Sequence, residues 1–125
     1  MAERLMTVVE TREFQRRTAA RMSEQERQDF ITFIAGFPEN GVLMRGTGGV
    51  RKSRWGAGAR GKSGGVRVIY DYHSPEIPIF LLTVFAKNER DNRSQAERNI
   101  LKQLTADLVT TYQRKIAYER GTHRR

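Results

Sequence analysis

Hydrophobic positions in the first 40 residues predict a short strand followed by two helices. Leu5 to Glu10 is rich in β-branched residues, which favours a strand. Thr11 can cap a short helix that ends near Thr18. Ser23 and Glu26 form a Ser-x-x-Glu capping box, which satisfies free backbone N–H groups at a helix start. The helix that follows carries apolar residues at spacings of three and four, as a core-facing helix does: Phe30, Ile31, Phe33, Ile34 and Phe37.

The middle of the chain predicts three strands. Val50 to Trp55 and Val66 to His73 alternate in character, as strands with two different faces do. Ile79 to Ala86 is apolar at nearly every position, which is typical of a central strand that is covered on both faces. Short turns join these three consecutive strands, which predicts an antiparallel sheet with helices on one side.

The last third of the chain predicts one long amphipathic helix. Ser94 and Glu97 repeat the capping-box pattern at its start. Apolar residues then recur every four positions and predict a stripe that packs on the sheet: Ile100, Leu104, Leu108, Tyr112 and Ile116. We expect this helix to end at Tyr118, with residues 119–125 as a frayed basic tail.

These elements predict the fold class. The expected order is β-α-α-β-β-β-α, with an antiparallel sheet, N-terminal helices and a long C-terminal helix. This is an α+β architecture. The length of 125 residues fits a single domain over residues 1–125.

Composition and charge narrow the function classes. The formal net charge is +9, and 18 of the 23 basic residues are arginine, which favours nucleic acid as a partner. No cysteine is present, so thiolate metal sites and cysteine nucleophiles are excluded. The longest apolar run has ten residues, half of what a membrane helix needs, and no secretory signal is visible. We therefore expect a cytoplasmic protein with no membrane partner.

The basic charge is concentrated between Asn40 and Tyr70. This stretch has no acidic residue, and it holds nine of the eleven glycines and seven cations: Arg45, Arg51, Lys52, Arg54, Arg60, Lys62 and Arg67. A run of this kind can simply be a solvated loop. Seven cations without an acid also repel one another, and a polyanion would relieve that repulsion.

The glycine-rich segment Gly56–Ser63 matches the phosphate-binding pattern G-x-x-x-x-G-K-[ST]. That motif requires a helix after the lysine, because the helix N-terminus binds the phosphates. Here two glycines and the strand-like Val66–Tyr70 follow instead. We therefore predict a basic hairpin loop that binds no nucleotide cofactor.

Four cations are candidates for phosphodiester chemistry. Lys52 and Arg54 lie on one face of a predicted strand, Arg67 lies on the next strand, and Lys87 ends the central strand. If these strands are neighbours, the four charges converge where they can stabilise a pentacoordinate phosphorus without a metal. RNA supplies its own 2′-hydroxyl nucleophile, so no protein nucleophile is needed. No cluster of His, Asp and Glu has the spacing of a metal site.

The general acid and base are not decided by these residues. Lys52 and Lys87 are candidates for the base, because neighbouring positive charges favour loss of a lysine proton. Glu89 is another candidate, although an ion pair with Lys87, Arg90 or Arg93 is the favoured role. His73, at a strand end, and His123, in the tail, are expected to be structural or exposed.

Three segments resemble a known family. Gly46–Arg54, Gly64–Tyr70 and Leu81–Glu89, joined by the basic glycine loop, resemble HigB-type toxins of the RelE superfamily. The resemblance extends over roughly Leu5 to Tyr112. It implies an endoribonuclease of a type II toxin–antitoxin module that enters the 30S ribosomal A site and cuts translated mRNA. It also implies a cognate antitoxin, here expected to have a helix-turn-helix fold.

The resemblance also assigns roles to residues. Lys52 and Arg54 match the two basic residues on the second strand of the RelE active site, and Arg67 matches the arginine on the third. Asn88 stands where RelE has an arginine, and Lys87 beside it is expected to supply that charge. The residues expected to bind RNA or the ribosome are Arg45, Arg51, Arg60, Lys62 and Asn88. Two alternatives remain: a ParE-type toxin that binds DNA gyrase without enzymatic activity, and a non-toxic RNA-binding module.

Overall fold

The computed structural model describes residues 5–56, 65–87, 89 and 95–123. The chain forms two compact units, Met1–Asn92 and Arg93–Arg125, and each is described by itself. The prediction of a single domain over residues 1–125 stays a prediction. Among the described residues, no helix is both long enough and apolar enough to cross a membrane.

The first unit begins with strand β1 (Val8–Glu10), helix α1 (Arg12–Thr18) and helix α2 (Glu24–Gly36), as predicted. The Thr11 side chain accepts a hydrogen bond from the Phe14 N–H and caps α1. Both bonds of the Ser23–Glu26 capping box are present at the start of α2. The local signals in the sequence therefore predicted both helix starts correctly.

The sheet has five strands in the order β1-β5-β4-β3-β2. The strands after α2 are β2 (Val42–Leu43), β3 (Val50–Trp55), β4 (Val66–Asp71) and β5 (Ile79–Ala86). All pairs from β2 to β5 are antiparallel, but β1 pairs with β5 in parallel. The sheet is therefore mixed at this edge rather than wholly antiparallel. Parallel strands need a long connection, and here the chain between β1 and β5 contains two helices and three strands.

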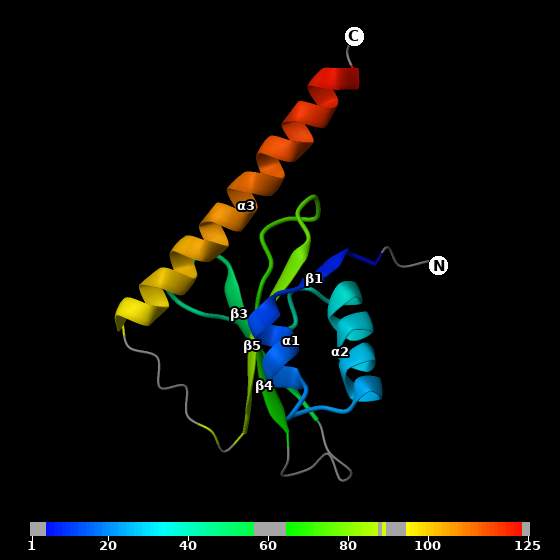
Figure 1. The fold of residues 1–125 in the computed structure, drawn as a ribbon, viewed down its shortest axis with the longest axis vertical. Coiled ribbons are helices and arrows are strands. Elements are labelled where there is room, and N and C mark those ends of the chain that lie inside the picture. The colour runs from blue at the N-terminus through cyan, green and yellow to red at the C-terminus, as the bar shows by residue number, and fades with distance from the viewer. Residues whose placement is uncertain (1–4, 57–64, 88, 90–94, 124–125) are drawn as a thin grey trace. The chain divides into compact units, whose positions relative to one another are not determined.

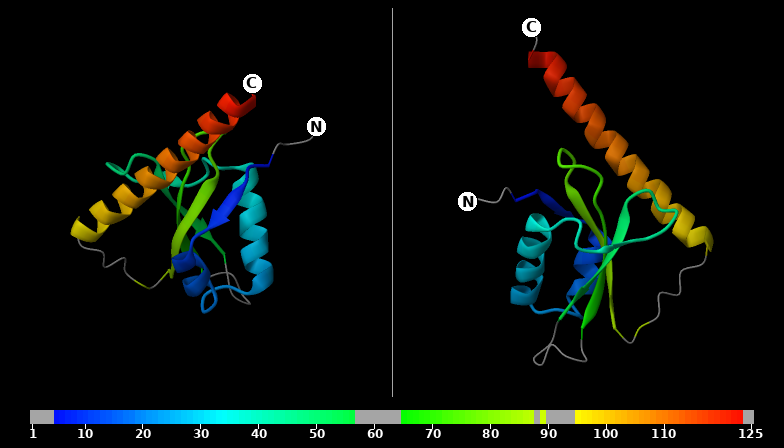
Figure 2. Two further views of the ribbon diagram at one scale, coloured as in Figure 1. Left: turned by 45° about the horizontal axis from the view of Figure 1, so that its top comes forward. Right: turned by 180° about the vertical axis from the view of Figure 1, so that it is seen from behind.

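The α+β fold class is confirmed, with one strand more than predicted. The additional strand is β2, whose two residues are too few to show alternation in the sequence. Figures 1 and 2 show α1 and α2 on the same face of the sheet. The core lies between these helices and the strands, and its fully buried members include Phe14, Phe30, Ile34, Val68 and Tyr70.

A bulge in β5 changes which side chains face the core. Tyr70 pairs with Leu81 and Ile69 pairs with Thr83, so Leu82 is the extra residue. An extra residue reverses the alternation beyond it. Leu81 and Val84 both belong to the core cluster for this reason, although their numbers differ in parity.

A buried tyrosine joins β4 to the loop before β2. The Tyr70 hydroxyl donates to the Pro38 carbonyl at 2.7 Å and accepts from the Gly41 N–H at 2.8 Å. Gly41 is packed so closely that an added Cβ would lie 2.8 Å from the Tyr70 ring and 3.0 Å from the Lys52 carbonyl oxygen. This contact fixes the chain that leads from α2 into the sheet.

The second unit is helix α3 (Gln95–His123). It continues through Gly121, so the predicted end at Tyr118 is five residues too early, and the residues to 123 are helical rather than frayed. Ile100 and Leu104 of the predicted stripe are exposed. Ser94 and the side chain of Glu97, the predicted capping box, lie outside the described residues, and the packing of α3 on the sheet stays a prediction.

Candidate nucleic-acid interface

The β3–β4 register brings three predicted site residues together. Trp55 packs against Phe30 of α2, with ring centroids 5.4 Å apart, so the odd-numbered side of β3 faces the helices. Lys52 and Arg54 therefore lie on the opposite face of the sheet, because strand side chains alternate. Arg54 pairs directly with Arg67 of β4, and Lys52 pairs with Ile69. We call Lys52, Arg54 and Arg67 the basic face.

Direct pairing places these charges within reach of one phosphate. The Cβ atoms of directly paired residues lie about 5 Å apart, and those of diagonal neighbours lie about 7–8 Å apart. Lys52 and Arg54 are exposed, and Arg67 is half-buried. Among the ion pairs of the described residues, none includes a member of the basic face. Three close cations that form no ion pair with a described residue make a site that attracts an anion.

Lys87 lies at the end of β5, beside this face. Its backbone N–H donates to the Gly65 carbonyl at 2.8 Å, which continues the β4–β5 pairing by one residue. Phe85 pairs with Arg67, and Lys87 follows two positions later on the same side of the strand. The Lys87 side chain is exposed. Register therefore puts a fourth cation diagonally across from Arg67.

Glu89 forms ion pairs, as predicted, and its partners among the described residues are Arg21 and Arg17 rather than Lys87. The other two predicted partners, Arg90 and Arg93, lie outside the described residues. Arg21 donates to both carboxylate oxygens at 2.9 and 2.8 Å, and Arg17 lies 3.9 Å away. The Arg21 hydrogen bonds, together with one from the Ala86 N–H, hold the pKa of Glu89 down to about 2. A carboxylate with so low a pKa is a poor general base near neutral pH.

Arg51 and Arg45 lie away from the basic face. The Arg51 guanidinium donates to the Glu39 and Gly41 carbonyls at 3.2 and 2.9 Å, so this side chain holds the loop before β2. Arg45 is exposed in the turn before β3, about 13 Å of strand from Arg54. The other predicted RNA-binding residues, Arg60, Lys62 and Asn88, lie outside the described residues.

His73 lies away from the basic face. His73 is exposed and follows the far end of β4, more than about 13 Å of strand from Arg67. The side chain of His123 lies outside the described residues. The exposed position of His73 agrees with the prediction of an exposed or structural role.

The segment that resembles a phosphate-binding loop leads into a strand. Most of Gly56–Ser63 lies outside the described residues, but β4 begins at Val66, where a phosphate-binding motif requires a helix. Gly56 and Gly65 are the described residues on either side of residues 57–64, and both adjoin the end of the hairpin where Arg54 pairs with Arg67. The first described residues after the segment thus lead into a strand, not into the helix that the nucleotide motif needs.

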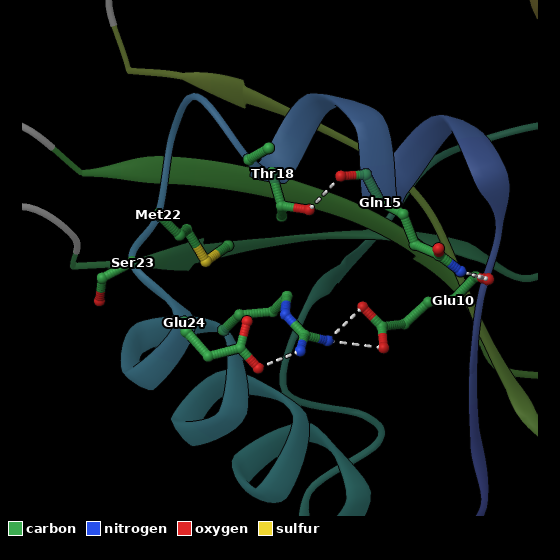
Figure 3. A pocket seen from close by; sticks show the side chains of 8 residues that line it. Glu10, Gln15, Thr18, Met22, Ser23 and Glu24 are labelled. Carbon is green, nitrogen blue, oxygen red and sulfur yellow. Dashed lines mark hydrogen bonds and ion pairs between the residues drawn. The ribbon is translucent and has the colours of Figure 1, made fainter.

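A pocket of about 340 Å³ lies on the helical side of the sheet (Figure 3). Glu10 and Glu24 enter it, and Arg27 bonds to both of them. Arg27 Nη1 lies 2.7 Å from each Glu10 carboxylate oxygen. The charges in this pocket are thus paired with one another, in contrast to the basic face.

Asp71 is a buried acid at the far end of β4. Its side chain is 1% exposed, and neither carboxylate oxygen has a hydrogen-bond partner within the described part of the chain. Burial raises the pKa of Asp71 to about 6. The unfolded chain releases this proton near pH 3.8, so the stability that Asp71 contributes is complete below pH 3.8 and is lost as pH rises to about 6.

Asp71→Asn is therefore expected to raise the free energy of unfolding at pH 8 by about 1–3 kcal/mol. The gain should shrink toward zero at pH 4, where both side chains are neutral. Urea denaturation at the two pH values measures this difference. Asp29→Asn is the control, because Asp29 is exposed on α2. An equal gain at both pH values would show that charge burial is not the cause.

Arg17 and Arg21 were not among the residues predicted for the site. Each bonds to residues 67 or 68 positions later, Arg17 to the Val84 carbonyl and Arg21 to Glu89. Their one local signal is a basic stretch near the end of α1, which also fits a solvated helix face. Contacts this distant in sequence become visible only in the folded structure.

The family of the chain follows from a comparison that covers almost all of it. A sequence model of the family described as RelE toxin of RelE / RelB toxin-antitoxin system matches residues 6–122. The fold agrees with this match, since it has N-terminal helices, a five-stranded sheet and a long C-terminal helix. The chain therefore belongs to the RelE toxin family of toxin–antitoxin systems.

Proposed function

We propose that this toxin is a metal-independent endoribonuclease of the HigB-type branch that cleaves translated mRNA in the ribosomal A site. The observation that carries the proposal is the direct pairing of Arg54 with Arg67, with Lys52 beside them on the same face. A toxin that acts only by binding a protein does not need this cluster of cations, which form no ion pair with any residue that the structure describes. The proposed partners are mRNA, the 30S subunit in the cytoplasm, and a helix-turn-helix antitoxin.

The proposed reaction needs charge stabilisation and two proton transfers. The 2′-hydroxyl oxygen attacks the adjacent phosphorus, and the bond to the 5′-oxygen breaks, which leaves a cyclic phosphate. Arg67 stabilises the extra negative charge of the phosphorane, while Lys52 and Arg54 hold the phosphate oxygens. A base takes the 2′-hydroxyl proton, and an acid gives a proton to the 5′-oxygen. Lys52 and Lys87 are our candidates for these transfers.

Induction of the toxin in a bacterium tests the function. One message is supplied in two copies, one translated and one with its start codon removed, and primer extension locates the 5′ ends. We expect cuts in the translated copy alone. Cuts in both copies would contradict ribosome dependence. Intact mRNA together with double-strand DNA breaks would contradict the proposal and favour the gyrase-binding alternative.

A further inference from the structure

The edge of β5 is completed by side chains instead of a strand. β1 pairs with β5 only from Ile79 to Leu81, so among the described residues no strand neighbours the rest of this edge. Thr11 Oγ1 donates to the Leu82 carbonyl at 3.1 Å, and Arg17 Nε donates to the Val84 carbonyl at 2.8 Å. These bonds satisfy edge groups that would otherwise need water or another strand.

Glu89 completes the same edge and closes the turn at its end. Its carboxylate accepts from the Ala86 N–H at 2.6 Å, and its own N–H donates to the Ala86 carbonyl at 2.9 Å. The Arg21 fork binds both oxygens of the carboxylate, and Arg21 Nη1 also donates to the Arg17 carbonyl at 3.0 Å. The end of β5 is thereby tied to the C-terminal end of α1.

Lys87 lies inside the turn that Glu89 closes. It follows Ala86 directly, and its N–H bonds to Gly65 on the strand that carries Arg67. The Glu89 carboxylate itself is occupied by Arg21 and Ala86 rather than by Lys87. The turn therefore fixes the backbone of Lys87, and among the described residues the Lys87 ammonium group has no acidic ion-pair partner.

We propose that Glu89 is a positioning residue for RNA cleavage, which holds Lys87 beside Arg67 through its bonds to the Ala86 N–H and the Arg21 fork. The inference rests on the proposed function, because Lys87 matters only if the basic face binds the scissile phosphate. Glu89 does not touch RNA in this arrangement. It acts by fixing the strand end, and misplacement of a catalytic group by about 1 Å can cost 10²-fold in rate.

A double-mutant cycle tests this inference. Single-turnover cleavage of ribosome-bound mRNA is measured for Glu89→Ala, Lys87→Ala and the double variant. Each single variant is expected to lower the rate at saturating ribosomes by about 10- to 100-fold, with the half-saturating ribosome concentration unchanged. The double variant is expected to be no slower than Lys87→Ala alone. Glu89→Gln, whose amide oxygen can still accept from the Ala86 N–H, should recover part of the rate.

The control is Glu10→Ala, which breaks the bidentate bonds with Arg27 on the helical side of the sheet (Figure 3). It removes an ion pair whose arginine is as exposed as Arg21, so it should lower thermal stability as Glu89→Ala does. Cleavage by the folded Glu10→Ala protein is expected at the normal rate.

Two outcomes would overturn the role of Glu89. One is a silent Glu89→Ala variant, and the other is a double variant in which the two losses multiply. Normal cleavage by Arg67→Ala would instead contradict the proposed active site itself, independently of the result for Glu89. Hydrogen exchange at the Lys87 amide gives a readout that needs no activity. The Lys87 amide should exchange at least tenfold faster in Glu89→Ala than in Glu10→Ala, and equal exchange rates would contradict the inference.

Discussion

Arg67→Ala is expected to slow mRNA cleavage by about 10²–10³-fold, the usual cost of removing one preorganised donor to a transition-state oxyanion. Arg67 is the half-buried member of the basic face, directly paired with Arg54. Single-turnover cleavage on programmed ribosomes measures the loss. Arg67→Lys should be intermediate, since it keeps the charge but loses the planar fork.

Arg67→Ala should remain folded. Two like charges on directly paired residues destabilise a sheet, so removing one of them from the Arg54–Arg67 pair should leave the free energy of unfolding unchanged or raise it by up to about 1 kcal/mol. Arg12→Ala is the control, because Arg12 is an exposed arginine at the start of α1. It should cleave normally. Full activity of Arg67→Ala at matched concentration would remove Arg67 from the mechanism.

Gly41→Ala is expected to lower the free energy of unfolding by about 3 kcal/mol. The added methyl group would lie 2.8 Å from the Tyr70 ring and hydroxyl and 3.0 Å from the Lys52 carbonyl oxygen. The backbone carbonyl cannot move without disturbing β3, so the tyrosine must shift and its bonds to Gly41 and Pro38 weaken. Overpacking and unsatisfied buried polar groups each cost about 1–3 kcal/mol.

Urea denaturation of Gly41→Ala measures this loss against Gly36→Ala. A Cβ at Gly36 would meet only the end of the Leu5 side chain at 3.5 Å, an ordinary contact distance. Alanine also favours the helix at that position, so Gly36→Ala should be neutral or slightly stabilising. Equal stability of the two variants would contradict the packing argument at Gly41.

Local patterns in the sequence predicted most of the secondary structure and one part of the site. The capping residues Thr11 and Ser23 predicted both N-terminal helix starts, because capping involves only neighbouring backbone groups. Strand alternation placed Lys52 and Arg54 on one face. The same alternation also separates Arg51 from them, and its bonds to the loop before β2 agree with that.

Tertiary structure alone decided how distant segments meet. The sequence does not state the register that pairs Arg54 with Arg67, because the connection between their strands is longer than a tight turn. The parallel pairing of β1 with β5 and the extra residue at Leu82 likewise depend on the packing of α1 and α2 against the sheet. Arg21 and Glu89 are 68 positions apart, and only the folded chain brings the cation to the carboxylate. Local propensity acts over a few residues, whereas these contacts depend on burial of the whole core.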